Sequence, residues 1–247
     1  MKIAAYPVFM PRGVQATILQ PDPHVPVDRF GPWLASSRVL VRARPLWSGP
    51  VPTPADVGDG VVLLGGTMSV HDRADHPWID PLKDLLVQLV EAEVPVLAIC
   101  LGHQLLAEAF GGSVTVADPG GGEHGAHEIF WTGMGRQDPL TERIAVGATS
   151  LVAESHSDVV TVLPPGATLL ASSERYANQA FRIGSAVGVQ FHPEASPDLM
   201  GRWAELGDGD AREMRRSMQR HDTEVSRNGR LLAQAFSGQL RQRSLAA

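Results

Sequence analysis

Short apolar segments alternate with longer amphipathic ones along the first half of the chain. Four of the short segments are predicted strands, at residues 16–20, 38–44, 61–65 and 94–100. Between the last two, residues 78–93 predict a helix, because one apolar stripe at helical spacing contains Leu82, Leu85, Leu86, Leu89 and Val90. Strands that alternate with helices in this way are typical of βα units around a parallel sheet.

The pattern changes after Gly112, where short strand candidates are separated by Gly, Pro and Asp. These candidates lie at 113–117, 127–132, 150–154, 168–172, 178–183 and 186–191. From about residue 198 to 240 the chain is charged and predicted to be mostly helical, with Pro197 near the start. We predict an α/β fold: a flavodoxin-like, doubly wound, mostly parallel sheet flanked by helices, with a small antiparallel extension. It would form one domain over residues 16–240, after an N-terminal extension, residues 1–15, to which no role is assigned.

Composition narrows the classes of function. The chain of 247 residues is 43% hydrophobic, which is enough to bury a full core. Its formal charge is −6 and its lysines and arginines form no cluster, so nucleic-acid binding is not predicted. A single cysteine cannot form an internal disulfide, which favours a reducing compartment. No other residue stands at a metal-ligand spacing from this cysteine, so we predict no metal, and we also predict no cofactor. Neither an apolar segment long enough to span a membrane nor a secretory leader is recognised. We expect a cytoplasmic protein whose partners are small molecules or other proteins.

The segment AICLGHQ contains the single cysteine, Cys100. The apolar run before it predicts a central strand, and Gly102 allows a tight turn into a helix. Cys100 would then lie at the carboxyl end of a strand, where α/β sheets bind ligands and where a helix N-terminus favours the thiolate. The arrangement is similar to the nucleophile elbow of serine hydrolases. The alternative is a buried cysteine that acts only as a small hydrophobic residue.

A base and a group that orients it are present in the segment GVQFHPE. His192 and Glu194 follow a predicted strand two residues apart, so both side chains face the same side, and Pro193 disfavours helix there. Glu194 can accept a hydrogen bond from one ring nitrogen, which leaves the other to take a proton from Cys100. The alternative is a surface histidine beside a solvated glutamate.

Two backbone N–H groups are candidates for an oxyanion hole. Leu101 directly follows the nucleophile, and the pair Gly65 and Gly66 follows a neighbouring predicted strand. Glycines allow a ligand to approach the backbone closely, although a plain turn would also explain the pair.

Together, AICLGHQ, GVQFHPE and the GG loop resemble the class I glutamine amidotransferase family, over about residues 16–237. Residues 155–184 are similar to the glutaminase part of GMP synthase and its stand-alone relatives. The resemblance implies Cys100 as nucleophile, His192 as proton shuttle and Glu194 as its partner, with Gly66 and Leu101 as oxyanion donors. It also implies a substrate site formed by Gln104, Ser155, His156, Ser157 and Asp158, whereas His103 is interpreted as structural.

Several positions depart from the family pattern and keep alternatives open. Ala98 stands in place of a glycine, and we expect little effect. Thr67 is expected to loosen the oxyanion loop, and Gly122 and Ser157 alter the substrate edge. No P-loop and no pyrophosphatase loop is recognised, so we expect ammonia to pass to a separate acceptor or synthetase protein. One alternative is hydrolysis of another γ-glutamyl amide, such as a γ-glutamyl polyamine, and another is a non-catalytic binding or regulatory module. The sequence does not predict the acceptor or the oligomeric state.

Overall fold

The computed structural model describes residues 13–246, and the predicted extension at residues 1–15 lies outside this part except for its last three residues. The strands are β1 (Gln15–Gln20), β2 (Leu40–Pro45), β3 (Gly60–Leu63), β4 (Val96–Ile99), β5 (Ser113–Thr115), β6 (Glu123–Trp131), β7 (Thr149–His156), β8 (Val159–Val162), β9 (Thr168–Ser173), β10 (Ala180–Ile183) and β11 (Ala186–Val189). The helices are α1 (Phe30–Ser36), α2 (Ile79–Glu91), α3 (Leu101–Ala109), α4 (Pro197–Leu206) and α5 (Ala211–Ala246), with a short 3-10 turn η1 (Pro54–Asp56).

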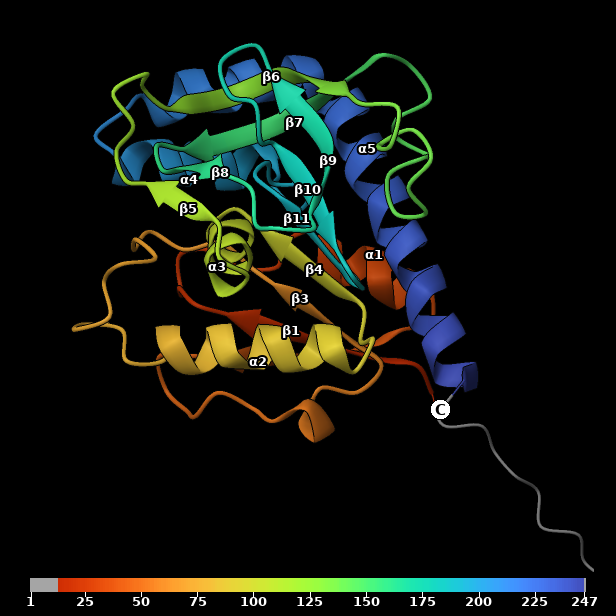
Figure 1. The fold of residues 1–247 in the computed structure, drawn as a ribbon. Coiled ribbons are helices and arrows are strands. Elements are labelled where there is room, and N and C mark those ends of the chain that lie inside the picture. Colours follow the sequence, from red (N-terminus) through yellow and green to blue (C-terminus); the bar gives the residue numbers. More distant parts are fainter. Residues whose placement is uncertain (1–12, 247) are drawn as a thin grey trace, which may run out of the picture.

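One nine-stranded sheet carries the fold, in the order β2-β1-β3-β4-β11-β10-β9-β6-β7 (Figure 1). The strands from β2 to β11 pair in parallel, in the order expected of a flavodoxin-like sheet. From β11 to β7 every pairing is antiparallel. The predicted fold class is confirmed, and the antiparallel extension comprises β10, β9, β6 and β7.

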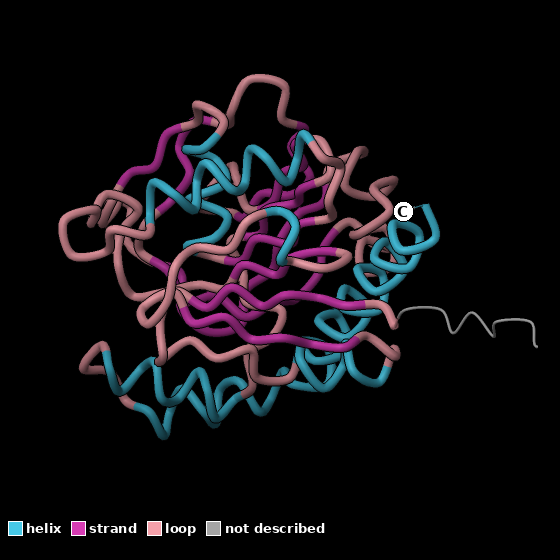
Figure 2. Tube along the Cα trace, turned by 90° about the horizontal axis from the view of Figure 1, so that it is seen from below, coloured by secondary structure: helices cyan, strands magenta, loops and turns pink. Residues whose placement is uncertain are grey.

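Both faces of the central strands are buried, which explains why these segments are apolar at every position. In β3, Val61 and Leu63 pack on the side of α2 and α3, whereas Val62 packs on the side of α1 and α5. The view from below shows helices on both sides of the sheet (Figure 2). The predicted stripe of α2 is buried through Leu82, Leu85, Leu86 and Leu89.

Two elements are not predicted by the sequence pattern. Helix α1 has seven residues and contains Gly31 and Pro32, so it is too short to display a helical period. Strand β8 follows a polar segment and pairs with β5 in a separate two-stranded sheet. The domain boundaries proposed from the sequence stay a prediction.

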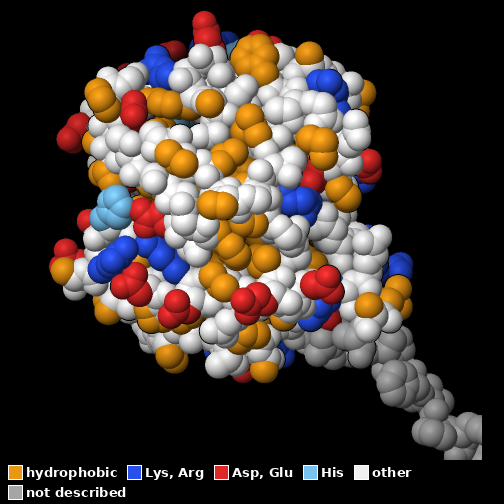
Figure 3. Space-filling model, viewed as in Figure 1, with side chains coloured by type: hydrophobic (Ala, Val, Ile, Leu, Met, Phe, Trp, Pro, Cys, Tyr) orange, Lys and Arg blue, Asp and Glu red, His pale blue; other side chains and the backbone are white. Residues whose placement is uncertain are grey.

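The surface in Figure 3 carries acidic and basic side chains interspersed over its lower part, with apolar side chains across its middle. Among residues 13–246, no helix combines the length and the apolar character needed to cross a bilayer.

Candidate active site

The predicted chemical groups meet at the carboxyl ends of three adjacent strands. Gly65 and Gly66 follow β3, Cys100 follows β4, and His192 follows β11, and these strands are neighbours in the sheet. Because parallel strands end at the same edge, segments far apart in the sequence are brought together there.

Cys100 occupies the turn between β4 and α3 in an unusual backbone conformation, with φ of 51° and ψ of −106°. Its N–H donates to the carbonyl of Val189 over 2.9 Å, and its carbonyl accepts from the N–H of Gln104 over 3.1 Å. The sequence assigns the tight turn to Gly102, but the positive φ belongs to Cys100 itself. Gly102 instead allows close packing, since a Cβ there would lie 2.7 Å from the carbonyl oxygen of Leu63. The turn therefore holds the thiol at a fixed orientation.

His192 and Glu194 form a buried pair beside this thiol. Nδ1 of His192 lies 2.7 Å from Oε1 of Glu194, and the exposed fractions of the two residues are 2% and 0%. Burial on its own lowers the pKa of His192, but the charge of Glu194 and the charge and hydrogen bonding of Cys100 raise that pKa well above its ordinary value. The imidazolium is therefore favoured next to the sulfur at neutral pH. The ring of Trp203 packs against that of His192, with centroids 4.6 Å apart.

Two further groups contact the sulfur. Nε2 of Gln190 donates to Sγ of Cys100 over 3.6 Å, and the carbonyl of Ser155 lies 3.9 Å from Sγ. Gln190 lies two residues before His192, so the strand alternation that pointed to His192 and Glu194 would also have pointed to it.

The GG loop lies against the pair His192 and Glu194, as a candidate oxyanion site requires. A Cβ at Gly65 would lie 3.0 Å from Cε1 of His192, and one at Gly66 would lie 2.8 Å from a methyl carbon of Leu101. The backbone of Gly66 is thus next to the first residue of α3, whose free N–H groups face the same edge. Donation by Gly66 and Leu101 to an oxyanion stays a prediction.

Thr67 does not loosen this loop in the way the sequence suggested. Both its N–H and its hydroxyl donate to the carboxylate of Asp22, the former over 2.9 Å, and the N–H of His24 donates to the same carboxylate over 2.7 Å. Burial alone would raise the pKa of Asp22, but these hydrogen bonds keep it below its ordinary value. Asp22, in the loop after β1, was not singled out from the sequence because its partner is distant along the chain.

If Gly66 donates to an oxyanion, replacing Asp22 with alanine is expected to lower any turnover at this site about 10-fold to 100-fold, because the loop that carries Gly66 loses its anchor. Asp56→Ala is a matched control, since Asp56 accepts from the N–H and hydroxyl of Thr53 in the same way on the exposed turn η1. Steady-state kinetics on both variants, with thermal unfolding to confirm folding, provide the measurement. Equal activity of a folded Asp22→Ala variant and wild type would contradict the anchoring role.

A cavity of about 360 Å³ opens over the sulfur. All five predicted substrate residues line it: Gln104, Ser155, His156, Ser157 and Asp158. Gln104 is itself engaged, since its Nε2 donates to the carbonyl of Asp158 over 3.0 Å. Its position braces the 155–158 segment, and direct contact of these residues with substrate stays a prediction.

Other cavity residues were missed by sequence reasoning: Val25, Met68, His124, Trp203, Leu206 and Gly207. His124 lies on β6, in the antiparallel extension, and Trp203 and Leu206 lie on α4. Their elements reach the sheet edge only through the tertiary arrangement, so no local pattern marks them.

His103 is fully buried on α3, as a structural residue would be. Its ring packs on that of Phe181, with centroids 4.9 Å apart, and its Nε2 lies 3.1 Å from the carbonyl of Asn178. Burial lowers the pKa of His103 from 6.5 to about 3.

Acid is therefore expected to destabilise the fold through His103. Below pH 6.5 this side chain binds a proton in the unfolded chain, whereas in the folded chain it stays neutral down to about pH 3. This contribution reaches about 1.4 kcal/mol per pH unit. A His103→Gln variant should lose it, so its free energy of unfolding should fall less between pH 7 and pH 4 than that of wild type. Urea unfolding across this range tests the difference, and parallel curves for the two proteins would argue against it.

The chain matches the family Glutamine amidotransferase class-I over residues 47–203. It is similar to the GMP synthase [glutamine-hydrolyzing] of Helicobacter acinonychis, with 36% identity over 135 residues, 55% of this chain and 24% of that protein. The chain thus spans about a quarter of that relative. It is also similar to a GMP synthase [glutamine-hydrolyzing] subunit of Methanopyrus kandleri, with 35% identity over 164 residues, 62% of this chain and 80% of that protein.

Solved structures agree in fold. A glutamine amidotransferase from Methylobacillus flagellatus has a TM-score of 0.79 at 25% identity, over 94% of this chain and 96% of that chain. One from Thermotoga maritima has a TM-score of 0.77 at 24% identity, over 94% and 99%, and supports the fold alone. Because the family match covers well over half of the chain, and the Methanopyrus kandleri protein is matched over 80% of its length, the chain belongs to the class-I glutamine amidotransferase family.

Proposed function

We propose that the protein hydrolyses the side-chain amide of L-glutamine through a thioester on Cys100. The observation that carries the proposal is the Cys100 elbow placed beside the buried His192 and Glu194 pair. A thiol at a strand end, a base beside it and a carboxylate hydrogen-bonded to that base form the arrangement that nucleophilic catalysis requires.

The reaction divides into two acyl transfers. The Cys100 thiolate attacks the amide carbon, and the oxyanion accepts hydrogen bonds from the N–H groups of Gly66 and Leu101. The His192 imidazolium gives its proton to the leaving nitrogen, so the C–N bond breaks and ammonia departs from the thioester. His192, now neutral, takes a proton from water as the water attacks the thioester, and the C–S bond breaks to release glutamate. Glu194 stabilises each imidazolium and fixes the ring.

We further propose that the ammonia is used by a separate synthetase protein. The relatives from Methanopyrus kandleri and Archaeoglobus fulgidus are each named as one subunit of GMP synthase, and they support an arrangement in which glutaminase and acceptor are different chains. Such an acceptor would bind near the sheet edge that carries the cavity over Cys100, since ammonia is released there.

A second candidate function is hydrolysis of a γ-glutamyl amide with a larger amine. A second cavity, of about 540 Å³, shares His124, Ser155, Trp203 and Gly207 with the first. The residues that line only this second cavity include Met200 and Met214 with Asp210 and Glu213, which would suit an alkyl chain ending in a cation. Glutamine itself would leave this second cavity unfilled.

A substrate panel separates the two functions. Wild type and Cys100→Ala are incubated with glutamine and with γ-glutamyl amides of increasing amine length, and ammonia and free amine are measured separately. Faster release of ammonia from glutamine supports the first function, and a preference for the longer amides supports the second. In parallel, a glutamine-like electrophile should add its mass to the Cys100 peptide. No labelling, together with no hydrolysis above the variant's background, would leave the binding-module alternative.

A further inference from the structure

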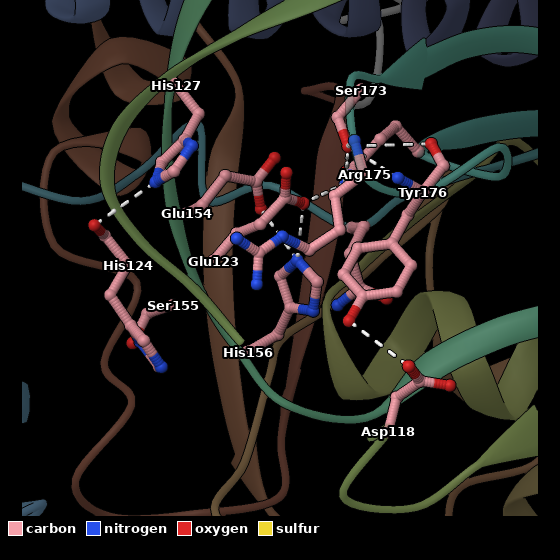
Figure 4. A network of polar contacts seen from close by, with 12 residues as sticks. Asp118, Glu123, His124, His127, Glu154, Ser155, His156, Ser173, Arg175 and Tyr176 are labelled. Atoms are coloured by element: carbon pink, nitrogen blue, oxygen red, sulfur yellow. Dashed lines mark hydrogen bonds and ion pairs between the residues drawn. The ribbon is translucent and has the colours of Figure 1, made fainter. Parts of the chain in front are cut away.

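A buried cluster of Glu123, Glu154 and His156 lies behind the wall of the active-site cavity (Figure 4). Glu123 and His156 face each other across the antiparallel pair β6 and β7, and Glu154 precedes His156 by two residues on the same side of β7. Nε2 of His156 is 3.1 Å from Oε2 of Glu123 and 3.6 Å from Oε2 of Glu154. The exposed fractions are 3%, 0% and 5% in chain order, so water does not reach the cluster freely.

A hydrogen bond identifies one ring nitrogen of His156 that carries a hydrogen. Nδ1 of His156 lies 3.2 Å from the carbonyl of Asp158, which can only accept, so Nδ1 carries a hydrogen. In neutral His156 the lone pair is then on Nε2, directed at two carboxylate oxygens. Lone pairs that face one another in a dry interior repel, so either a hydrogen on Nε2 or a metal ion must lie between the ring and the carboxylates.

Glu154 adds an independent sign that a partner belongs there. Neither of its carboxyl oxygens has a hydrogen-bond partner, although the side chain is fully buried. No lysine or arginine forms an ion pair with either glutamate within residues 13–246. A buried carboxyl without a partner is costly and calls for an explanation.

We propose that Glu123, Glu154 and His156 bind a divalent transition-metal ion of the Zn²⁺ class. Two carboxylates and one neutral imidazole balance its charge, and oxygen and imidazole nitrogen are ligands that Zn²⁺ accepts. Bonds of about 2.0–2.2 Å in tetrahedral geometry separate neighbouring ligand atoms by roughly 3.3–3.5 Å, close to the two separations in the cluster. The outer contacts also fit: the N–H of His156 Nδ1 donates to a carbonyl, and Nε2 of Gln179 donates to Glu123 over 2.6 Å.

The ion would act on the structure of the active-site wall and not on the reacting atoms. Glu154 and His156 flank Ser155, and Ser155 and His156 line the cavity. The carbonyl of Ser155 is the group that lies 3.9 Å from Sγ of Cys100. A metal held by residues on both sides of Ser155 would fix the position of that carbonyl.

The test measures metal binding in a Cys100→Ala background, because the active-site thiol and His192 could also take up Zn²⁺. Protein purified with Zn²⁺ present is analysed for metal content, stripped with a chelator and titrated with Zn²⁺ by calorimetry. We expect one ion per chain, and Glu154→Gln should weaken binding by more than the roughly 10–100-fold that loss of an outer contact costs. Glu128→Gln is the matched control, because Glu128 lies on the same strand as Glu123 but is exposed. This variant should bind Zn²⁺ as tightly as the Cys100→Ala parent does.

A crystal of the Cys100→Ala protein grown with Zn²⁺ provides a second measurement that does not depend on the folding of the Glu154 variant. An anomalous peak between Glu123, Glu154 and His156 is the expected result. Absence of the peak from this position, or equal Zn²⁺ affinity with and without the Glu154 carboxylate, would overturn the proposal. An infrared band of a protonated carboxylic acid that disappears in Glu154→Gln but does not change when Zn²⁺ is added would also overturn the proposal. Such a band would show that Glu154 holds a proton in place of the metal.

Discussion

Cys100→Ala is expected to abolish hydrolysis of the γ-glutamyl amide, with a loss of roughly 10⁴-fold or more in turnover. The side chain is small and nearly buried at 6% exposure, so alanine removes the sulfur with little change of shape. Thermal unfolding should therefore change little while activity disappears. Activity above background in the folded variant would show that another group is the nucleophile.

His192→Ala should come close to the same loss, because the thiol loses its proton acceptor and the leaving ammonia its donor. Glu194→Gln should be milder, on the order of 10²–10⁴-fold, since the ring stays in place while the charge that raises the pKa of His192 is lost. Because the three residues act as a unit, the double variant Cys100→Ala, His192→Ala should be no worse than Cys100→Ala alone. Additive losses would contradict the triad.

Gly66→Ala is expected to reduce turnover about 100-fold or more, because loss of one oxyanion donor costs that much. An added Cβ would meet the sulfur of Met68 and lie 2.8 Å from a methyl carbon of Leu101, so the loop must shift and move the N–H of Gly66. Since the donor acts on the transition state, kcat should fall more than KM rises.

Gly238→Ala controls for the change of glycine to alanine. Gly238 lies in α5, and a Cβ there would meet no atom within 4 Å. This variant should keep full activity and gain stability slightly, because alanine favours helix. Normal kcat in a folded Gly66→Ala protein would remove Gly66 from the proposed oxyanion site.

The strand-end positions of Cys100, His192 and Glu194 were accessible from the sequence because each lies in a local pattern, whereas their joint role was implied by the family resemblance. Cys100 belongs to one strand-turn-helix segment, and His192 and Glu194 are two residues apart at one strand end, so periodicity placed them without knowledge of the fold. The parallel half of the sheet was predictable for the same reason, since its central strands β3 and β4 are apolar on both faces and its crossover helix α2 has a clear stripe.

Contacts between distant segments were not accessible in this way. Asp22 and Thr67 are 45 residues apart and come from two loops. Glu123 and Glu154 meet only through the register of β6 and β7, which a single sequence does not reveal. Thr67 shows the kind of error that results. Its residue type alone suggested a looser loop, whereas its hydrogen bonds to Asp22 anchor the loop.

The positive φ of Cys100 has a consequence for how this chain evolves. A non-glycine residue in such a conformation costs on the order of 1–3 kcal/mol, a noticeable part of a total stability of about 5–15 kcal/mol. Glycine would relieve that strain, so selection for stability alone would drive the thiol out of this position. A descendant that had lost its need for the reaction should therefore exchange this cysteine early and become more heat-resistant, which makes the residue at position 100 a marker of whether a related chain still performs chemistry.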